Sequence, residues 1–393
     1  MKSAPARRRN VFQPLYHGGR RGFTAIGKHI RVSVSSVVES LVLPAVLVVL
    51  AVALGEAHKP VTSKYTFNEH VLPIVRDRCG ACHVDGGAAP MSLLTYADAR
   101  PWAESIRAEL LDGHMPPAQA ESGVGVFRDA RLLPPRDLDV VLTWATGGTP
   151  EGPPVQPVVA QRRADWPLGP PDVVIALPSA VTLPPRIQET TEDVRLESRA
   201  LEGHAIRAVD LRPETPAMVR RAILYIKPPQ PDSGEGLRPE RVAACWLPDR
   251  RAAAPRDDAA FFFPRGAELR ARITYRKTWK YENAAMSDRS TVGVYLAEAS
   301  RAREIAAIQV SGSATIPRDV QAIAIRADVD AAEREVEATA VLPDGSRRLL
   351  IRFTGQREWP QRFWYEQPVA LPRGARLESA AGVIVDVVRA PPP

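Results

Sequence analysis

The sequence is poor in cysteine, with three cysteines among 393 residues. Two of them, Cys79 and Cys82, stand in one short motif, which leaves only Cys245. A single remaining thiol cannot build a disulfide framework, so a fold held together by disulfides is excluded. Cys245 is therefore interpreted as a small buried hydrophobic residue.

The chain also lacks an excess of basic charge outside its N-terminal segment. Residues 1–57 hold eight Lys or Arg and two Asp or Glu, a net charge of +6, and the remaining residues carry +1 of the total of +7. The basic bias is thus interpreted as a targeting address rather than a binding face. No nucleic-acid partner is expected.

An apolar run follows the basic N-terminal residues. Residues 41–54 are uncharged, a length typical of a signal-peptide core, whereas 32–54 is long enough to span a bilayer. Cleavage near residues 55–57 and retention as a membrane anchor both stay open. In either case residues 58–393 are expected on the periplasmic side of a bacterial inner membrane, with residues 1–57 as signal or anchor.

The feature with the clearest chemistry is a C-x-x-C-H motif at residues 79–83. Two thiols at this spacing can each form a thioether with one haem vinyl group, and the adjacent imidazole can then ligate the iron. A redox C-x-x-C pair should follow a strand, but this motif ends an apolar helical pattern over 67–75, and a zinc site would need a second ligand pair. The motif predicts one covalent haem c bound through Cys79, Cys82 and His83.

The sixth iron ligand is predicted to be Met115. It follows a predicted helix over 97–112 and precedes two prolines, which would hold its loop extended. A thioether ligand stabilises ferrous iron and raises the reduction potential. Met91 and His114 are the other candidates that the sequence offers.

The order of elements in residues 60–148 is that of a small all-α cytochrome domain. A last helix is predicted after Pro134 and Pro135, ending at two glycines. The stretch FNEHVLPIVRDRCGACHVDGGAAPMSLLTYADARPWAESIRAELLDGHMPP resembles the class I-like cytochrome c modules that precede copper monooxygenase-like regions in certain exported bacterial proteins.

A proline-rich stretch separates this domain from the rest. Residues 149–171 contain seven prolines and are predicted to be a semi-rigid linker. Beyond it, apolar residues alternate with polar ones, as over 269–275 and 292–296, and turn signals follow at 343–345 and 372–374. This pattern indicates an all-β region, a jelly roll or β-sandwich.

The β region is similar to the copper type II, ascorbate-dependent monooxygenases, relatives of the peptidylglycine hydroxylating enzyme. The similarity is carried by AVDLRPETPAMVRRAILYI, ITYRKTWKYENAAMSDRSTVGVYLAE and AVLPDGSRRLL with RFWYEQPVALPRGARLES. It implies two sandwiches, over 172–315 and 316–390, with one copper each. One copper takes three histidines, and the other takes two histidines and a methionine.

The copper ligands implied by this resemblance are missing. Arg220 and Arg221 stand where paired histidines are expected, Thr274 where one is expected, and no H-x-H occurs near 328–330. The chain has one histidine beyond the haem domain, His204, where five are required. Imidazole is the natural copper ligand, so copper is not expected and His204 is interpreted as a solvated loop residue.

These patterns predict a periplasmic mono-haem cytochrome that transfers single electrons. The copper-less β region would dock a redox partner protein or a respiratory-chain subunit. A haem-fed copper monooxygenase acting on an organic substrate is the alternative, and the histidine count disfavours it. A haem peroxidase would need an open iron position, which Met115 would fill. An electron carrier is therefore favoured over an enzyme, and no catalytic residue is assigned.

Overall fold

The computed structural model describes residues 62–117, 119–121, 123–128, 133–156, 166–229, 240–248, 255, 258–328, 335–355 and 361–391. These residues belong to one compact unit, Pro60–Pro393. The predicted signal or anchor at 32–54 lies outside them. Within the described ranges, no helix combines the length and the apolar character needed to cross a bilayer.

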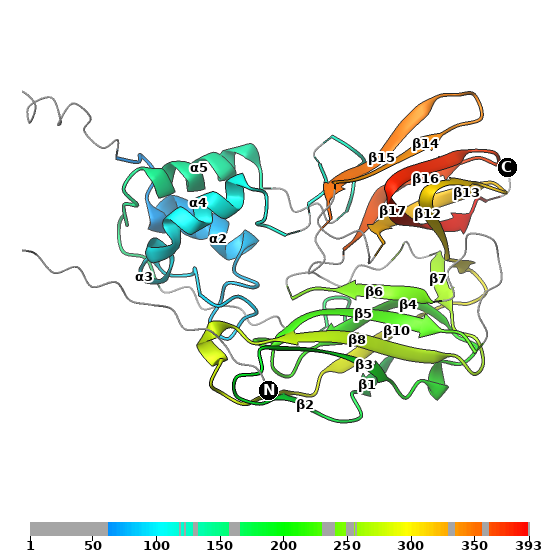
Figure 1. Cartoon of the computed structure of the whole chain (residues 1–393), viewed down its shortest axis with the longest axis horizontal. Helices are drawn as coiled ribbons and strands as arrows, with labels where there is room; N and C mark the ends of the chain where they lie inside the picture. The colour runs from blue at the N-terminus through cyan, green and yellow to red at the C-terminus, as the bar shows by residue number, and fades with distance from the viewer. Residues whose placement is uncertain are drawn as a thin grey trace, which may run out of the picture. The chain divides into compact units, whose positions relative to one another are not determined.

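Short helices form the first part of the described chain (Figure 1). They are η1 (Phe67–Val71), α2 (Leu72–Arg78), α3 (Tyr96–Ala99), η2 (Arg100–Trp102), α4 (Ala103–Leu111) and α5 (Pro135–Thr146). The single helix predicted over 97–112 is thus interrupted by the 3₁₀ turn η2. The interruption coincides with Pro101, which has no N–H to donate to the helical ladder.

A small apolar core holds these helices together. Phe67, Val71 and Val75 are buried, as their helical spacing predicts, whereas Ile74 of the same predicted face is only partly buried. Trp144 of α5 is fully buried, its ring centroid lies 5.5 Å from that of Phe67, and its Nε1 donates to the Pro150 carbonyl at 3.1 Å. The first and last helices therefore share one core.

Beyond the predicted linker the described chain is built mainly of strands, which agrees with the predicted all-β region. The elements are β1 (Val173–Ala176), β2 (Val181–Leu183), β3 (Glu189–Arg195), η3 (Arg199–Leu201), β4 (Ala205–Arg212), β5 (Val219–Lys227), β6 (Arg241–Trp246), β7 (Ala259–Phe262), β8 (Glu268–Arg276), η4 (Trp279–Tyr281), β9 (Met286–Asp288), β10 (Thr291–Ala297) and β11 (Arg303–Glu304). One sheet has the order β1-β10-β4-β7-β11, another β3-β8-β5-β6, and β2 pairs with β9. Cys245 lies on β6 and is partly rather than fully buried, because its side of this edge strand is incompletely covered.

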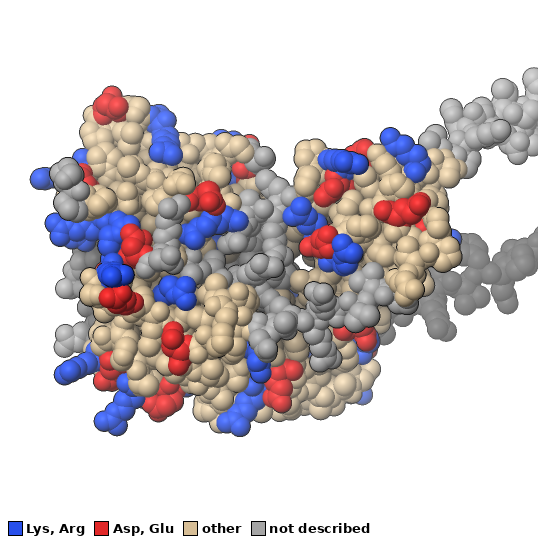
Figure 2. All heavy atoms as spheres, turned by 180° about the vertical axis from the view of Figure 1, so that it is seen from behind, with Lys and Arg blue, Asp and Glu red and all other residues tan. Residues whose placement is uncertain are grey.

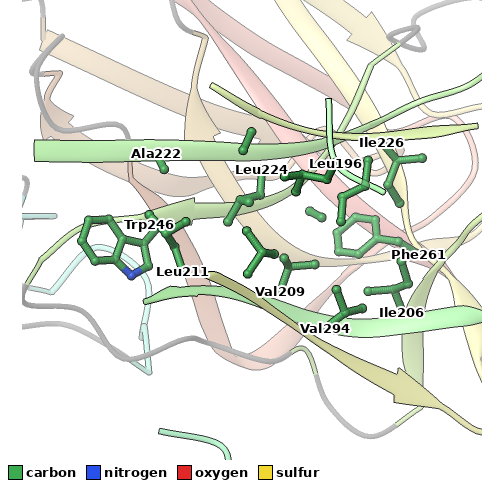
Figure 3. Close-up of a cluster of buried hydrophobic side chains, with 14 of the residues drawn as sticks. Leu196, Ile206, Val209, Leu211, Ala222, Leu224, Ile226, Trp246, Phe261 and Val294 are labelled. Carbon is green, nitrogen blue, oxygen red and sulfur yellow. The ribbon is translucent and has the colours of Figure 1, made fainter. Parts of the chain in front are cut away.

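Apolar side chains fill the space between the first two sheets (Figure 3). Leu224 and Ile226 of β5 point toward Val209 of β4 and Val294 of β10. The alternating residues of β8 that were predicted to face a core are all fully buried: Leu269, Ala271, Ile273 and Tyr275. The alternation in the sequence thus identifies the inner face of this strand.

A second group of strands forms one six-stranded sheet. Its members are β12 (Ala306–Thr315), β13 (Val320–Ala327), β14 (Glu335–Val341), β15 (Arg347–Thr354), β16 (Arg362–Leu371) and β17 (Arg376–Arg389). The order is β15-β14-β17-β13-β16, and β12 pairs with β17. The turn signals at 343–345 and 372–374 lie between consecutive strands, where Gly345 and Gly374 adopt φ values of +84° and +86°. Only glycine reaches such angles without strain.

A buried arginine joins the two groups of strands. Arg362 Nε of β16 lies 2.8 Å from Asp386 Oδ2 of β17, and both side chains are almost completely buried. The same guanidinium donates to the carbonyls of Val242 and Ala243 on β6. One arginine therefore ties the six-stranded sheet to the four-stranded sheet.

The segment between α4 and α5 pairs with the six-stranded sheet. Ala120 forms an antiparallel bridge with Phe353 of β15, and Phe127 forms one with Tyr365 of β16. The rings of Phe127 and Tyr365 lie 5.0 Å apart. The loop that carries Met115 therefore continues into a segment anchored on the β region.

Candidate cofactor site

The C-x-x-C-H motif forms a tight turn at the end of α2. Cys79 is the C-terminal cap of this helix, and its carbonyl accepts hydrogen bonds from the N–H groups of Cys82 at 3.1 Å and His83 at 2.9 Å. All three side chains are partly buried. The turn therefore brings both thiols and the imidazole to one helix end, as the motif predicts.

The loop that follows the motif is closely packed against it. The N–H of Ala89 donates to the Cys82 carbonyl, and the N–H of Leu93 donates to the His83 carbonyl, both at 3.1 Å. A Cβ atom on Gly87 would lie 2.4 Å from the Cys82 carbonyl oxygen, so only glycine allows this approach. The backbone around His83 is thus held in one conformation.

The His83 imidazole is oriented by the same loop. Its Nδ1 lies 3.3 Å from the Met91 carbonyl oxygen, which can accept a hydrogen bond only if Nδ1 carries the proton. Burial lowers the pKa of His83, the Met91 hydrogen bond opposes this, and the positive charge of Arg220 lowers the pKa further. The neutral ring then keeps a lone pair on Nε2, the state in which imidazole ligates a metal.

Large apolar side chains at the margin of the helical core are only partly buried. They include Ile74, Val84, Met91, Trp102, Ile106 and Leu110, and Cys79 of the motif belongs to the same margin. The donor set of two thiols and one imidazole, with this apolar margin, fits a covalently bound haem.

The predicted sixth ligand, Met115, is partly buried beyond the end of α4. The N–H groups of His114 and Met115 both donate to the Glu109 carbonyl, at 3.0 and 3.1 Å. The His114 ring is exposed and lies 3.4 Å from a Glu109 carboxylate oxygen. Met91 is joined to His83 through its carbonyl rather than its sulfur. Ligation by Met115 stays a prediction.

Two residues of the β region contact the loop after the motif, and sequence reasoning missed both. Arg220 Nη1 donates to the Ala88 carbonyl at 2.9 Å, and Lys280 Nζ lies 2.5 Å from Asp85 Oδ1. The sequence pattern marks Arg220 only as a replacement for a copper ligand. Since Ala88 and Arg220 are 132 positions apart, no local pattern signals their contact.

A bulge in β5 separates the two adjacent arginines. Val219 pairs with Tyr275 of β8 and Arg221 pairs with Thr274, so Arg220 is the extra residue. A β-bulge changes the direction in which a side chain points. Arg221 Nε donates to Thr274 Oγ1 at 3.1 Å, whereas Arg220 reaches the Ala88 carbonyl.

The other positions examined for copper ligands make ordinary polar contacts. Thr274 Oγ1 lies 2.9 Å from Thr191 Oγ1, and His204 is exposed, with Nδ1 3.2 Å from the Glu202 carbonyl oxygen. Of residues 328–330, only Asp328 is described. Among the side chains that the structure describes, no three His, Cys, Asp or Glu residues gather as a metal site. The expected lack of copper stays a prediction.

Two comparisons with known proteins found no relative of this chain. No family model matches the sequence, and no curated protein matches it.

Proposed function

We propose that this protein is a periplasmic mono-haem c-type cytochrome that transfers single electrons. The observation that carries the proposal is the placement of Cys79, Cys82 and His83 in one turn, with the imidazole held by the Met91 carbonyl. Two thiols and an oriented neutral imidazole are what a covalent haem requires of a protein. The bound haem would supply a one-electron couple.

The chain's own residues have distinct roles in this proposal. Cys79 and Cys82 provide the two attachment points, and His83 Nε2 provides the proximal nitrogen. The apolar residues that border the motif exclude water from the iron, which influences its reduction potential. Met115 provides the sixth ligand from the loop beyond α4.

The finer fold assignment belongs to the same proposal. The helical region would be a class I-like cytochrome c domain, and the strands would form a copper-free relative of the ascorbate-dependent monooxygenases. We propose that this β region docks a redox partner protein or a respiratory-chain subunit. On the face in Figure 2, acidic and basic side chains are interspersed, so docking there would use mixed charge rather than one strong field.

Haem attachment can be tested directly on denatured protein. Because thioether bonds are covalent, the full chain from the periplasmic fraction should keep its haem stain through denaturing electrophoresis. Replacing both Cys79 and Cys82 with alanine should abolish the stain. The matched control is Cys245→Ala. It should leave the haem stain unchanged, because Cys245 lies on β6 of the β region and not in the C-x-x-C-H motif.

Two results would contradict this function. A covalent haem stain that persists in the double cysteine variant would exclude the motif as the attachment site. Stoichiometric, tightly bound copper in the full chain would favour the haem-fed monooxygenase, since an electron carrier of this kind needs iron alone.

The sixth ligand can be tested by optical spectroscopy. Met115→Ala should remove the weak far-red charge-transfer band of the oxidised protein and lower its potential, because the thioether favours ferrous iron. Met91→Ala should keep the band, and so should His114→Ala, since that imidazole is exposed beside Glu109. Loss of the band in either of these variants, with Met115→Ala unaffected, would show that Met115 is the wrong residue.

A further inference from the structure

The β region contacts the loop after the motif, residues 84–91, through one partly buried and one exposed cation. Arg220 is partly buried and its Nε atom is fully buried, whereas the side chains of Lys280 and Asp85 are 45% and 82% exposed. An exposed ion pair contributes little because water and salt screen it. A charge at the buried contact is screened much less.

We propose that Arg220 is a positioning residue that raises the reduction potential of the haem. The inference rests on the proposed haem attachment. The guanidinium holds the loop over 84–91 through the Ala88 carbonyl and brings a fixed positive charge to the side of the site formed by His83. In this way the β region tunes the haem as well as offering a surface for a partner.

The direction of the effect follows from electrostatics. Reduction adds one negative charge to the iron, so a nearby positive charge favours the reduced state. Arg220 Nη1 donates to the Ala88 carbonyl, and the carbonyl of Met91 in the same loop lies 3.3 Å from His83 Nδ1. The guanidinium is therefore bonded to the loop that contacts the predicted proximal ligand.

The bulge in β5 explains why the effect should be specific to one arginine. Arg220 and Arg221 carry the same charge on adjacent residues, but Arg221 is bonded to Thr274 within the sheet. Of these two arginines, Arg220 is the one that donates to the loop after the motif. Arg221 is therefore a matched control, because it has the same side chain and charge but donates to Thr274 instead of to the loop after the motif.

The test is spectroelectrochemical titration of full-length variants that contain haem. Arg220→Gln and Arg220→Met should each lower the reduced-to-oxidised ratio at a fixed potential about tenfold, which is about 59 mV for one electron. Arg220→Lys keeps the charge and should stay near the wild-type potential. Arg221→Gln should leave the potential unchanged, and Lys280→Gln should change it less than Arg220→Gln does.

Each outcome decides the proposal. An unchanged potential in Arg220→Gln, or an equal shift in Arg221→Gln, would overturn it. If the uncharged Arg220 variants fail to fold, Arg220→Lys still decides, because a tenfold shift in that variant would exclude charge as the cause. A wild-type chain without covalent haem would instead contradict the proposed function. The haem stain after denaturing electrophoresis detects that outcome independently of the potential.

Discussion

The helical region and the β region complete their cores in different ways. In the β region the inner faces of the central strands are fully buried, and even the buried Arg362 lies beside Asp386 and donates to two carbonyls. In the helical region the fully buried core is small, and large side chains such as Trp102 and Ile106 that pack against it are only partly buried. The β cores also have partly buried apolar side chains at their margins, but only in the helical region does this margin include a thiol of the C-x-x-C-H motif.

This difference suggests which region depends on a cofactor. Fully burying one large apolar side chain contributes about 1.5–3 kcal/mol, so covering several partly buried ones would stabilise the helices substantially. The β region has far larger fully buried cores, which depend less on the partly buried side chains around them. We therefore expect changes at the motif to affect the helices first, and changes at the buried ion pair to affect the strands.

The largest expected effect is on the buried ion pair. Asp386→Leu should lower the free energy of unfolding by about 3–5 kcal/mol, because it leaves the Arg362 charge buried without its carboxylate. The double variant with Arg362→Met should recover part of that loss, since apolar replacement of both partners removes the uncompensated charge. Urea unfolding followed by circular dichroism measures both.

An exposed arginine in the same sheet is the control. Arg352 of β15 contacts Glu121 and Glu337, but its side chain is 36% exposed. Arg352→Ala should therefore cost less than about 1 kcal/mol. Equal losses for Arg352→Ala and Asp386→Leu would contradict the view that the β region depends on its buried pair.

A smaller contribution to the free energy of unfolding, from the carboxylate of Asp193, should depend on pH. Burial acts to raise the pKa of Asp193, but hydrogen bonds from Tyr225, Arg270 and Arg272 outweigh it and lower the pKa. A depressed pKa stabilises the fold above the unfolded value of about 3.9, and this is lost as the pH falls through the folded value.

Asp193→Asn should therefore cost about 1 kcal/mol at neutral pH. The difference from the wild type should begin to shrink as the pH falls below about 3.9, where the carboxylate of the unfolded chain takes up a proton, and should be lost once the folded carboxylate is protonated at a lower pH. Urea unfolding at both pH values measures it. A difference that is the same at neutral and acid pH would show that charge on Asp193 is not the cause.

Local patterns in the sequence predicted much of the fold because neighbouring residues determine them. The spacing of Phe67, Val71 and Val75 identified the buried face of the first helices, and alternation identified the inner face of β8. The prediction was less accurate for β10, where Tyr295 alternates with apolar residues and yet is buried. Its hydroxyl donates to the Gly169 carbonyl at 2.9 Å, so the end of the predicted linker covers that face.

Contacts between distant segments could not be predicted in this way. The motif brought Cys79, Cys82 and His83 together by spacing alone, but the Arg220 contact depends on a bulge that the residue types do not signal. The pairing of Phe127 with Tyr365 likewise joins segments that only the folded chain brings together. Such contacts arise from strand register and packing rather than from any local pattern.

The most direct test of the comparison is hydrogen exchange on the full chain with and without the thiols of Cys79 and Cys82. In the variant with Cys79→Ala and Cys82→Ala, amides of α2 and α4 should exchange about a hundredfold faster, because about 2.7 kcal/mol of local stability corresponds to that factor. Amides of β5, β8, β13 and β17 should be unchanged. Equal protection of the helices in both proteins would contradict the account, because it would show that the helical region is complete without a cofactor.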